Sequence, residues 1–165
     1  MRLEGSCHCG AVRFSVESRT PYPVNHCYCS TCRKTNGGGG YTINLMGEAD
    51  TFEVTGLEHV SVYRSSKNDR ERYEADGLGF TRRHFCARCG TMLWLYNPTY
   101  PAFVYPAASA IDTPLPVPPE RRAYMLDYRV PWSLVPDGAG DEHFPRYPED
   151  GIEDWHRRRG LYDAP

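Results

Sequence analysis

The sequence predicts an all-β protein, built of small antiparallel sheets folded over zinc sites, with short helical turns and a short C-terminal helix. Three observations predict this class: short runs of alternating apolar and polar residues, an abundance of Tyr (12) and Pro (14), and seven cysteines grouped in three tight clusters. Aromatic residues favour strands, and prolines favour ordered loops over a helical bundle. The 165 residues can bury one hydrophobic core and are most simply one domain.

The composition argues against nucleic-acid and membrane partners. The chain has 19 Lys and Arg against 21 Asp and Glu, so a basic surface for nucleic acid or anionic lipid is not evident. No apolar run approaches the roughly 20 residues of a membrane span, and the N-terminal residues lack the apolar stretch of a signal peptide. We therefore expect a cytoplasmic protein, in which grouped cysteines bind metal or act in catalysis rather than form disulfides. The odd count of seven cysteines also argues against complete disulfide pairing.

The first quarter of the chain places two cysteine clusters next to short strands. Residues 11–16 alternate as a half-buried strand, which makes residues 7–10 the tight turn of a hairpin. Residues 30–35 fit one or two helical turns, with Ser30 as the N-cap. The glycines at 37–40 form either a flexible connector or a backbone segment that approaches a ligand beside a metal ion.

The same alternation predicts strands through the rest of the chain, at residues 41–46, 51–55, 60–64, 91–96, 103–105 and 122–128. The charged residues 67–72 suit a solvated turn, and residues 113–119, with four prolines, suit a stiff extended connector. Residues 152–160 fit a short helix that ends at Gly160. We expect residues 1–135 to form a zinc-binding domain, with residues 136–165 as a C-terminal extension packed on it.

Four of the cysteines suit a closed, structural zinc site. Zinc favours four tetrahedral ligands, and thiolates at short spacing provide them. Cys7 and Cys9 supply two sulfurs from one hairpin, and Cys86 and Cys89 supply two from another. Because such a site leaves no position for a substrate, we expect this zinc to stabilise the fold by joining distant segments.

The other three cysteines, Cys27, Cys29 and Cys32, suit an open zinc site. Three protein ligands and one free position are typical of a catalytic zinc, where water or a substrate thiolate completes the coordination. We expect this second ion to be the more labile one. Two alternatives remain at this stage: the two clusters could exchange partners, or a histidine could close the second site, the candidates being His8, His26 and His84.

Three ordered cysteine motifs resemble those of a known family. Cys7-x-Cys9-Gly10, Cys27-x-Cys29-x-x-Cys32-Arg33 and Phe85-Cys86-x-x-Cys89-Gly90-Thr91 are similar to the glutathione-dependent formaldehyde-activating enzyme family, which includes centromere protein V. The likeness spans about residues 3–135 and includes the segment 128–132 near its end. It implies an all-β fold over two zinc ions, with the same division into structural and active-centre cysteines.

The resemblance also implies carbon–sulfur lyase chemistry, in which glutathione and formaldehyde combine to S-hydroxymethylglutathione. We therefore expect a zinc-dependent enzyme that adds glutathione or a similar small thiol to an aldehyde, or reverses that addition. Arg33 and Lys34 are candidates to pair with the carboxylates of glutathione, and Gly38 and Gly39 to offer backbone N–H groups. No residue is marked by the sequence as a general acid or base. The alternatives are a zinc-stabilised protein-interaction module without catalysis and a redox or metal sensor.

Overall fold

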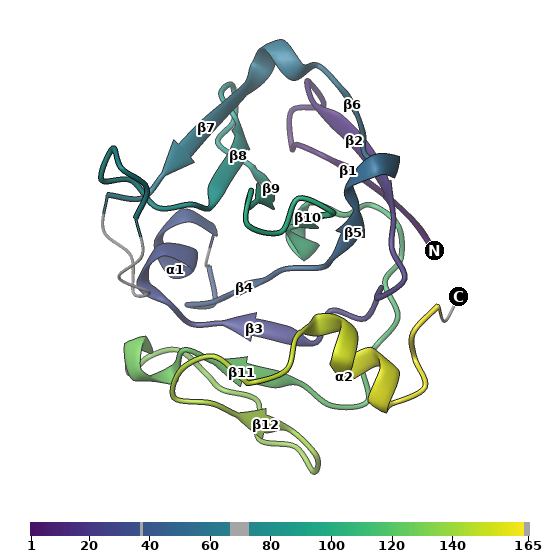
Figure 1. Ribbon diagram of the computed structural model, residues 1–165, viewed down its shortest axis with the longest axis vertical. Helices are drawn as coiled ribbons and strands as arrows, with labels where there is room; N and C mark the ends of the chain where they lie inside the picture. The colour runs from purple at the N-terminus through teal and green to yellow at the C-terminus, as the bar shows by residue number, and fades with distance from the viewer. Residues whose placement is uncertain (37, 67–72, 164–165) are drawn as a thin grey trace.

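The computed structural model describes residues 1–36, 38–66 and 73–163. Within these ranges the strands form three sheets, of three, five and four strands. Figure 1 shows the first two sheets in the upper part of the molecule and the third below them, with the short helix α1 (Ser30–Asn36) between the two parts. The predicted all-β class with small sheets and short helices is confirmed.

The first sheet contains the hairpin predicted around the first cysteine cluster. Strand β1 (Arg2–Ser6) pairs antiparallel with β2 (Arg13–Glu17), and β2 also pairs with β6 (Glu53–Thr55). Because side chains alternate along a strand, Leu3 and Val16 point into the core from opposite positions of the hairpin and are fully buried. The connection between β1 and β2 contains the first cysteine pair.

The five-stranded sheet shares a core with the first sheet. All its neighbouring strands are antiparallel, in the order β5 (Gly47–Glu48), β10 (Phe103–Pro106), β9 (Met92–Tyr96), β8 (Arg82–Cys86) and β7 (Val60–Arg64). The buried Trp94 of β9 lies edge-on to Phe14 and Phe52, with ring centroids 5.5 and 5.0 Å apart. These aromatic contacts hold the two sheets together.

The third sheet is mixed and holds the central cysteine cluster. Its order is β12 (Glu142–His143), β11 (Arg122–Tyr124), β3 (Asn25–Cys27) and β4 (Thr42–Ile43). Strand β11 runs parallel to both β3 and β12, whereas β3 and β4 are antiparallel. The hydroxyl of Thr42 donates to the carbonyl of Cys32 at 3.0 Å, which fixes α1 onto the end of this sheet.

The C-terminal segment packs against the third sheet through helix α2 (Ile152–Arg158), at the lower right of Figure 1. Trp155 and His156 of this helix are fully buried. The buried Arg122 of β11 pairs with Glu142, at 2.8 Å, and with Asp150. Strand β12 and α2 therefore extend the same body, while a boundary at residue 135 stays a prediction.

Several predicted strands have different bounds: β2 is shifted from 11–16 to Arg13–Glu17, and the strand predicted at 51–55 begins at Glu53, after a 3₁₀ turn. Two others differ for clear local reasons. Of the strand predicted at 41–46 only β4 (Thr42–Ile43) forms, because the chain passes there from the third sheet to the five-stranded one, which it joins at β5 just beyond the predicted range. The strand predicted at 122–128 ends at Tyr124, since Met125 adopts a φ of 61° and the 3₁₀ turn Leu126–Tyr128 follows. The backbone of Met125 thus turns away from the extended conformation that the apolar pattern favoured.

Other predicted elements agree with the structure. The strand at 60–64 is confirmed, and the C-terminal helix ends two residues before Gly160, whose φ is 66°. Further 3₁₀ turns are Ala49–Thr51, Leu57–His59 and Ala108–Ala110. The turn predicted at residues 67–72 lies outside the described residues. Among the residues described, no helix has the length and apolar character that crossing a membrane requires.

Candidate active site

The first cysteine group joins two hairpins that lie far apart in the sequence. Cys7 and Cys9 follow β1, Cys86 ends β8, and Cys89 lies in the turn before β9. The four sulfurs lie within 4.8 Å of one another, and Cys9 Sγ is 3.5 Å from Cys7 Sγ and 3.8 Å from Cys86 Sγ. Both turns end in glycine at positive φ, 73° at Gly10 and 76° at Gly90, which lets the backbone fold around the sulfurs.

Hydrogen bonds around this group favour the thiolate form of two of its members, Cys7 and Cys89. The backbone N–H of Val12 donates to Cys7 Sγ at 3.2 Å. Hydrogen bonds from Thr91, whose Oγ1 is 3.2 Å from Cys89 Sγ, lower the pKa of Cys89 to about 5. A backbone hydrogen bond from Ala11 lowers the pKa of Cys9, but partial burial and the neighbouring thiols raise it overall, to about 11. Four thiolates at this distance need a cation between them, and the donor set suits zinc.

The second cysteine group is buried where β3 runs into α1. Cys27 ends β3, Cys29 directly precedes α1, and Cys32 lies in the first turn of the helix, with 3%, 6% and 5% of their surfaces exposed. The sequence predicted Ser30 as the N-cap, but Ser30 is the first helical residue. Instead the sulfur of Cys29 accepts the backbone N–H of Cys32 at 3.3 Å, as a cap would. The helix start thereby fixes two of the three sulfurs.

The pKa values of the cysteines in the second group also favour the binding of a cation. Hydrogen bonds from Cys27 and Cys29, together with the charge of the nearby Arg83, hold the pKa of Cys32 well below its usual value. Hydrogen bonds with Cys29 and Cys32 and full burial raise the pKa of Cys27 well above its usual value. The protein alone therefore supports one thiolate among three close thiols. A divalent cation would allow all three to ionise, so these residues fit a metal ion.

Histidines do not join either group in the part of the chain that the structure describes. Both groups have the predicted membership, and neither includes a histidine. The ring of His26 stacks on Tyr41, with centroids 4.7 Å apart, and that of His84 stacks on Trp94, at 5.0 Å. All seven cysteines are free thiols. The alternatives of exchanged partners and of a closing histidine therefore find no support in the geometry.

A cavity of about 300 Å³ borders the three buried thiols. Its volume is at the lower end of the range for small-molecule sites. One wall comes from the third sheet and α1, through Cys27, Cys29, Cys32 and Tyr124. The facing wall comes from the five-stranded sheet and the segments next to it, through Thr81, Arg83, Leu95 and Asn97. The thiols thus face a space enclosed between two sheets.

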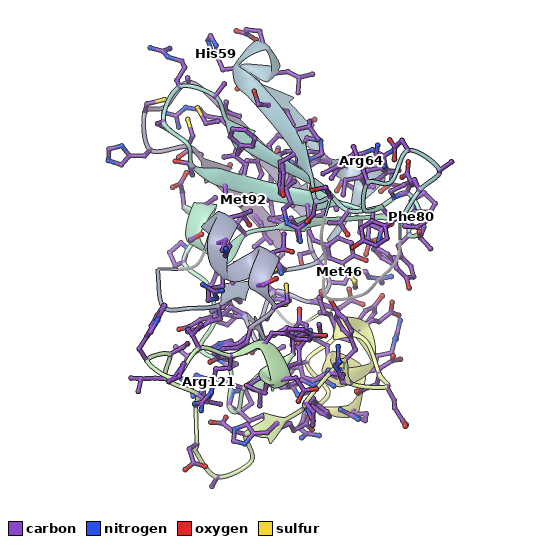
Figure 2. The ribbon with its side chains drawn as sticks, turned by 90° about the vertical axis from the view of Figure 1, so that its left-hand side faces the viewer. Met46, His59, Arg64, Phe80, Met92 and Arg121 are labelled. Atoms are coloured by element: carbon purple, nitrogen blue, oxygen red, sulfur yellow. The ribbon has the colours of Figure 1, made fainter. Side chains whose placement is uncertain are left out.

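The segment 79–81 forms another side of this cavity and is held by Arg64. The Nε of Arg64 donates to the carbonyl of Gly79 at 3.1 Å. In Figure 2 the labelled Arg64 and Phe80 lie close together on one side of the molecule. A larger cavity, of about 760 Å³, shares several lining residues with the first, among them Asn44, Asn97 and Tyr124. The two spaces adjoin, so the site has room beyond the immediate surroundings of the sulfurs.

The predicted substrate contacts lie away from this space. Arg33, Lys34, Gly38 and Gly39 are not among the residues that line either cavity. The carbonyl of Gly39 instead accepts the hydroxyl of Ser133 at 2.7 Å. Contacts between these four residues and a substrate remain a prediction that the cavity geometry does not support.

Apart from the three cysteines, the sequence did not mark the residues of the cavity wall, and the two of them that hydrogen-bond the cysteines are Arg83 and Tyr124. Tyr124 pairs in register with Cys27 across β11 and β3, a juxtaposition that needs the strand order. The sequence did contain a local indication that Arg83 faces inward, because adjacent residues of a strand point to opposite faces. Arg82 and Arg83 could therefore not both face solvent in the strand that leads to Cys86.

Fold and site together define a β-rich protein with two cysteine groups, one of four residues and one of three that faces a cavity, each able to hold a metal ion. Residues 2–127 match the family described as glutathione-dependent formaldehyde-activating enzyme. The chain belongs to this family.

Individual relatives agree with this assignment. A protein of Halomonas elongata named "Putative glutathione-dependent formaldehyde-activating enzyme" is 52% identical over 165 residues, which cover 99% of this chain and 100% of that protein. A crystal structure of a Rhodobacter sphaeroides protein covers 87% of this chain and 99% of its own, with 20% identity and a TM-score of 0.52. At that identity the structural likeness shows a shared fold.

Proposed function

We propose that this protein catalyses the addition of a small thiol, glutathione or a close analogue, to formaldehyde, as a carbon–sulfur lyase in the reverse direction. In the addition the thiol sulfur forms a bond to the aldehyde carbon. The electron pair of the C=O π bond moves to oxygen, which takes up the proton that the thiol loses. Membership of the family supports this chemistry. The observation that carries the proposal is the set of three buried thiols on the wall of a cavity, with no fourth donor in their group among the described residues.

The proposed cofactors are two zinc ions. Cys27, Cys29 and Cys32 would hold one, and the group of Cys7, Cys9, Cys86 and Cys89 would hold the other. When bound at the three-cysteine group, zinc supplies Lewis acidity and favours the thiolate form of a bound thiol. The four-cysteine group would leave no position for a substrate and is proposed to stabilise the fold.

Two further features of the cavity would assist the addition: the protonated hydroxyl of Tyr124 and a partly apolar wall. Burial raises the pKa of Tyr124 well above its usual value, so this side chain keeps its proton at neutral pH. Its hydroxyl hydrogen-bonds the sulfur of Cys27. A change of partner to the oxygen that becomes negative during the addition would let the hydroxyl donate a hydrogen bond there. Phe80, Leu95 and Met125 on the cavity wall limit the water around the reacting groups.

The test is an exchange measurement by NMR with ¹³C-formaldehyde and glutathione, which also combine without catalysis. The zinc-loaded protein is expected to increase the rate of exchange between free formaldehyde and S-hydroxymethylglutathione, and Cys29→Ser to abolish the increase. The control is Arg13→Ala, because this exposed residue of β2 does not line the cavities and its loss should leave the rate unchanged. An unchanged rate in Cys29→Ser would refute the proposed site.

A further inference from the structure

A buried arginine beside the second cysteine group lacks the partners that a structural role would give it. Arg83 lies on β8, exposes 8% of its surface and lines the cavity next to Cys32. Within the described residues its Nε has no hydrogen-bond partner, and no carboxylate forms an ion pair with its guanidinium. A buried charge without such partners is costly, so this position calls for a ligand or a function.

A second buried arginine, Arg122, shows which partners a guanidinium with a structural role has in this fold. Arg122 is fully buried, and two carboxylates, Glu142 and Asp150, pair with it from the C-terminal segment. Its Nε lies 2.8 Å from Glu142 Oε2. Arg83 has no equivalent among the described residues and faces the cavity instead. The contrast indicates that Cys32 is the anionic partner of Arg83 among the described residues, and that any carboxylate partner comes from elsewhere.

The cysteines account for only part of the hydrogen-bonding capacity of Arg83. A guanidinium has five N–H donors in a planar fork that matches a carboxylate. Cys32 can accept from one edge of the fork, while the N–H of Nε remains unused. One arginine can thus contact the thiolate group and a carboxylate of the ligand at the same time.

Unused acceptors lie along the same space. The side-chain oxygen of Asn44, which borders both cavities, is buried without a hydrogen-bond donor, and so is that of Asn25 in the larger one. Amide oxygens of this kind accept N–H groups, such as those of a peptide bond or an ammonium group. The lining therefore includes a cation next to the sulfurs and two amide side chains, those of Asn25 and Asn44.

We propose that Arg83 binds a carboxylate of the thiol substrate and so selects anionic, peptide-like thiols over neutral ones. This inference rests on the proposed function, because it takes the cavity to be the thiol-binding site. Arg83 is a substrate-binding residue in this scheme. The addition itself takes place at the sulfur and needs no charge from the carboxylate.

The experiment measures binding by titration calorimetry on the zinc-loaded protein, with glutathione and with glutathione diethyl ester, which has no free carboxylate. Wild-type protein should bind glutathione more tightly than the ester. Arg83→Met should weaken glutathione binding about 10- to 100-fold, as expected for one charge-assisted interaction, and leave ester binding almost unchanged. Arg83→Lys should restore part of the affinity. Arg82→Met is the matched control, since this neighbour on β8 does not line the cavities and should bind both ligands as wild type does.

Two results would overturn the inference. Equal affinity of the wild-type protein for glutathione and its ester would do so without any variant, even if Arg83→Met failed to fold. Equal weakening of both ligands by Arg83→Met would assign the arginine to the cysteine group alone. Preference for glutathione that depends on Arg83, in a protein that does not accelerate adduct formation, would support the inference and refute the proposed function.

Discussion

The hydroxyl of Tyr124 lies close to Cys27 because β3 and β11 run parallel with these two residues in register. We predict that Tyr124→Phe lowers kcat for adduct formation about 100-fold while changing KM little, because the lost donor acts on the developing negative charge. Steady-state kinetics by NMR exchange measures both constants.

The control for this prediction is Tyr28→Phe. The hydroxyl of Tyr28 donates to the carbonyl of Leu134 at 2.8 Å, and Tyr28 does not line either cavity. Its loss should reduce stability by about 1 kcal/mol and leave kcat unchanged. A wild-type kcat in Tyr124→Phe would remove this residue from the proposed mechanism.

Among single residues, the sequence predicted the members of the cysteine groups well and the other residues of the cavity poorly. The short spacings of Cys27, Cys29 and Cys32 bring their sulfurs together with little help from distant segments. Arg83 and Tyr124 reach the same space only through the pairing of strands that are separated by many residues. A single sequence does not contain that pairing, which is why the predicted contacts fell on Arg33 and Lys34, the neighbours in the chain.

Among the elements, α2 depends on a neutral histidine. His156 is fully buried, its Nδ1 bonds the carbonyl of Ile152 at 2.8 Å, and its Nε2 accepts the backbone N–H of Tyr22 at 3.3 Å. Burial lowers the pKa of His156, although the bond to Ile152 opposes this. A second proton on the ring would face the N–H of Tyr22, so only the neutral form fits.

This arrangement predicts a loss of stability in acid. The unfolded chain binds a proton near pH 6.5, and the folded chain only at a lower pH, so the contribution of His156 is complete above pH 6.5 and declines as the pH falls. Wild type and His156→Gln should therefore differ less in their free energy of unfolding as the pH falls below 6.5. This difference should shrink by at most about 1.4 kcal/mol per pH unit. Urea unfolding of both proteins across this range checks it, and parallel curves would contradict it.

Element types were predictable where one face is buried and the pattern is regular. The strand at 60–64 and the helix near the C-terminus follow from their patterns. The early end of the strand predicted at 41–46 could not be read from its sequence, because it reflects a passage between two sheets. Likewise the end of β11 depends on the positive φ of Met125, which the apolar pattern does not reveal.

For the molecule as a whole, the two cysteine groups should differ in what they stabilise. The four-cysteine group joins a hairpin of the first sheet to the turn between β8 and β9, and Cys86 is fully buried in the shared core. We predict that Cys86→Ser loses one metal ion and about 5 kcal/mol or more of unfolding free energy. Cys29→Ser should lose the other ion with a much smaller effect. Metal content and urea unfolding measure both, and equal destabilisation would argue against a division into structural and active centres.

The central claim is that the three-cysteine group holds a metal ion with one position free for a thiol. The most direct measurement is a titration of the cobalt-substituted protein with glutathione, followed by absorption spectroscopy. The account predicts two cobalt ions per chain, with glutathione changing the bands of one of them, and no such change in Cys29→Ser. A single bound ion, or bands that glutathione leaves unaltered, would contradict it.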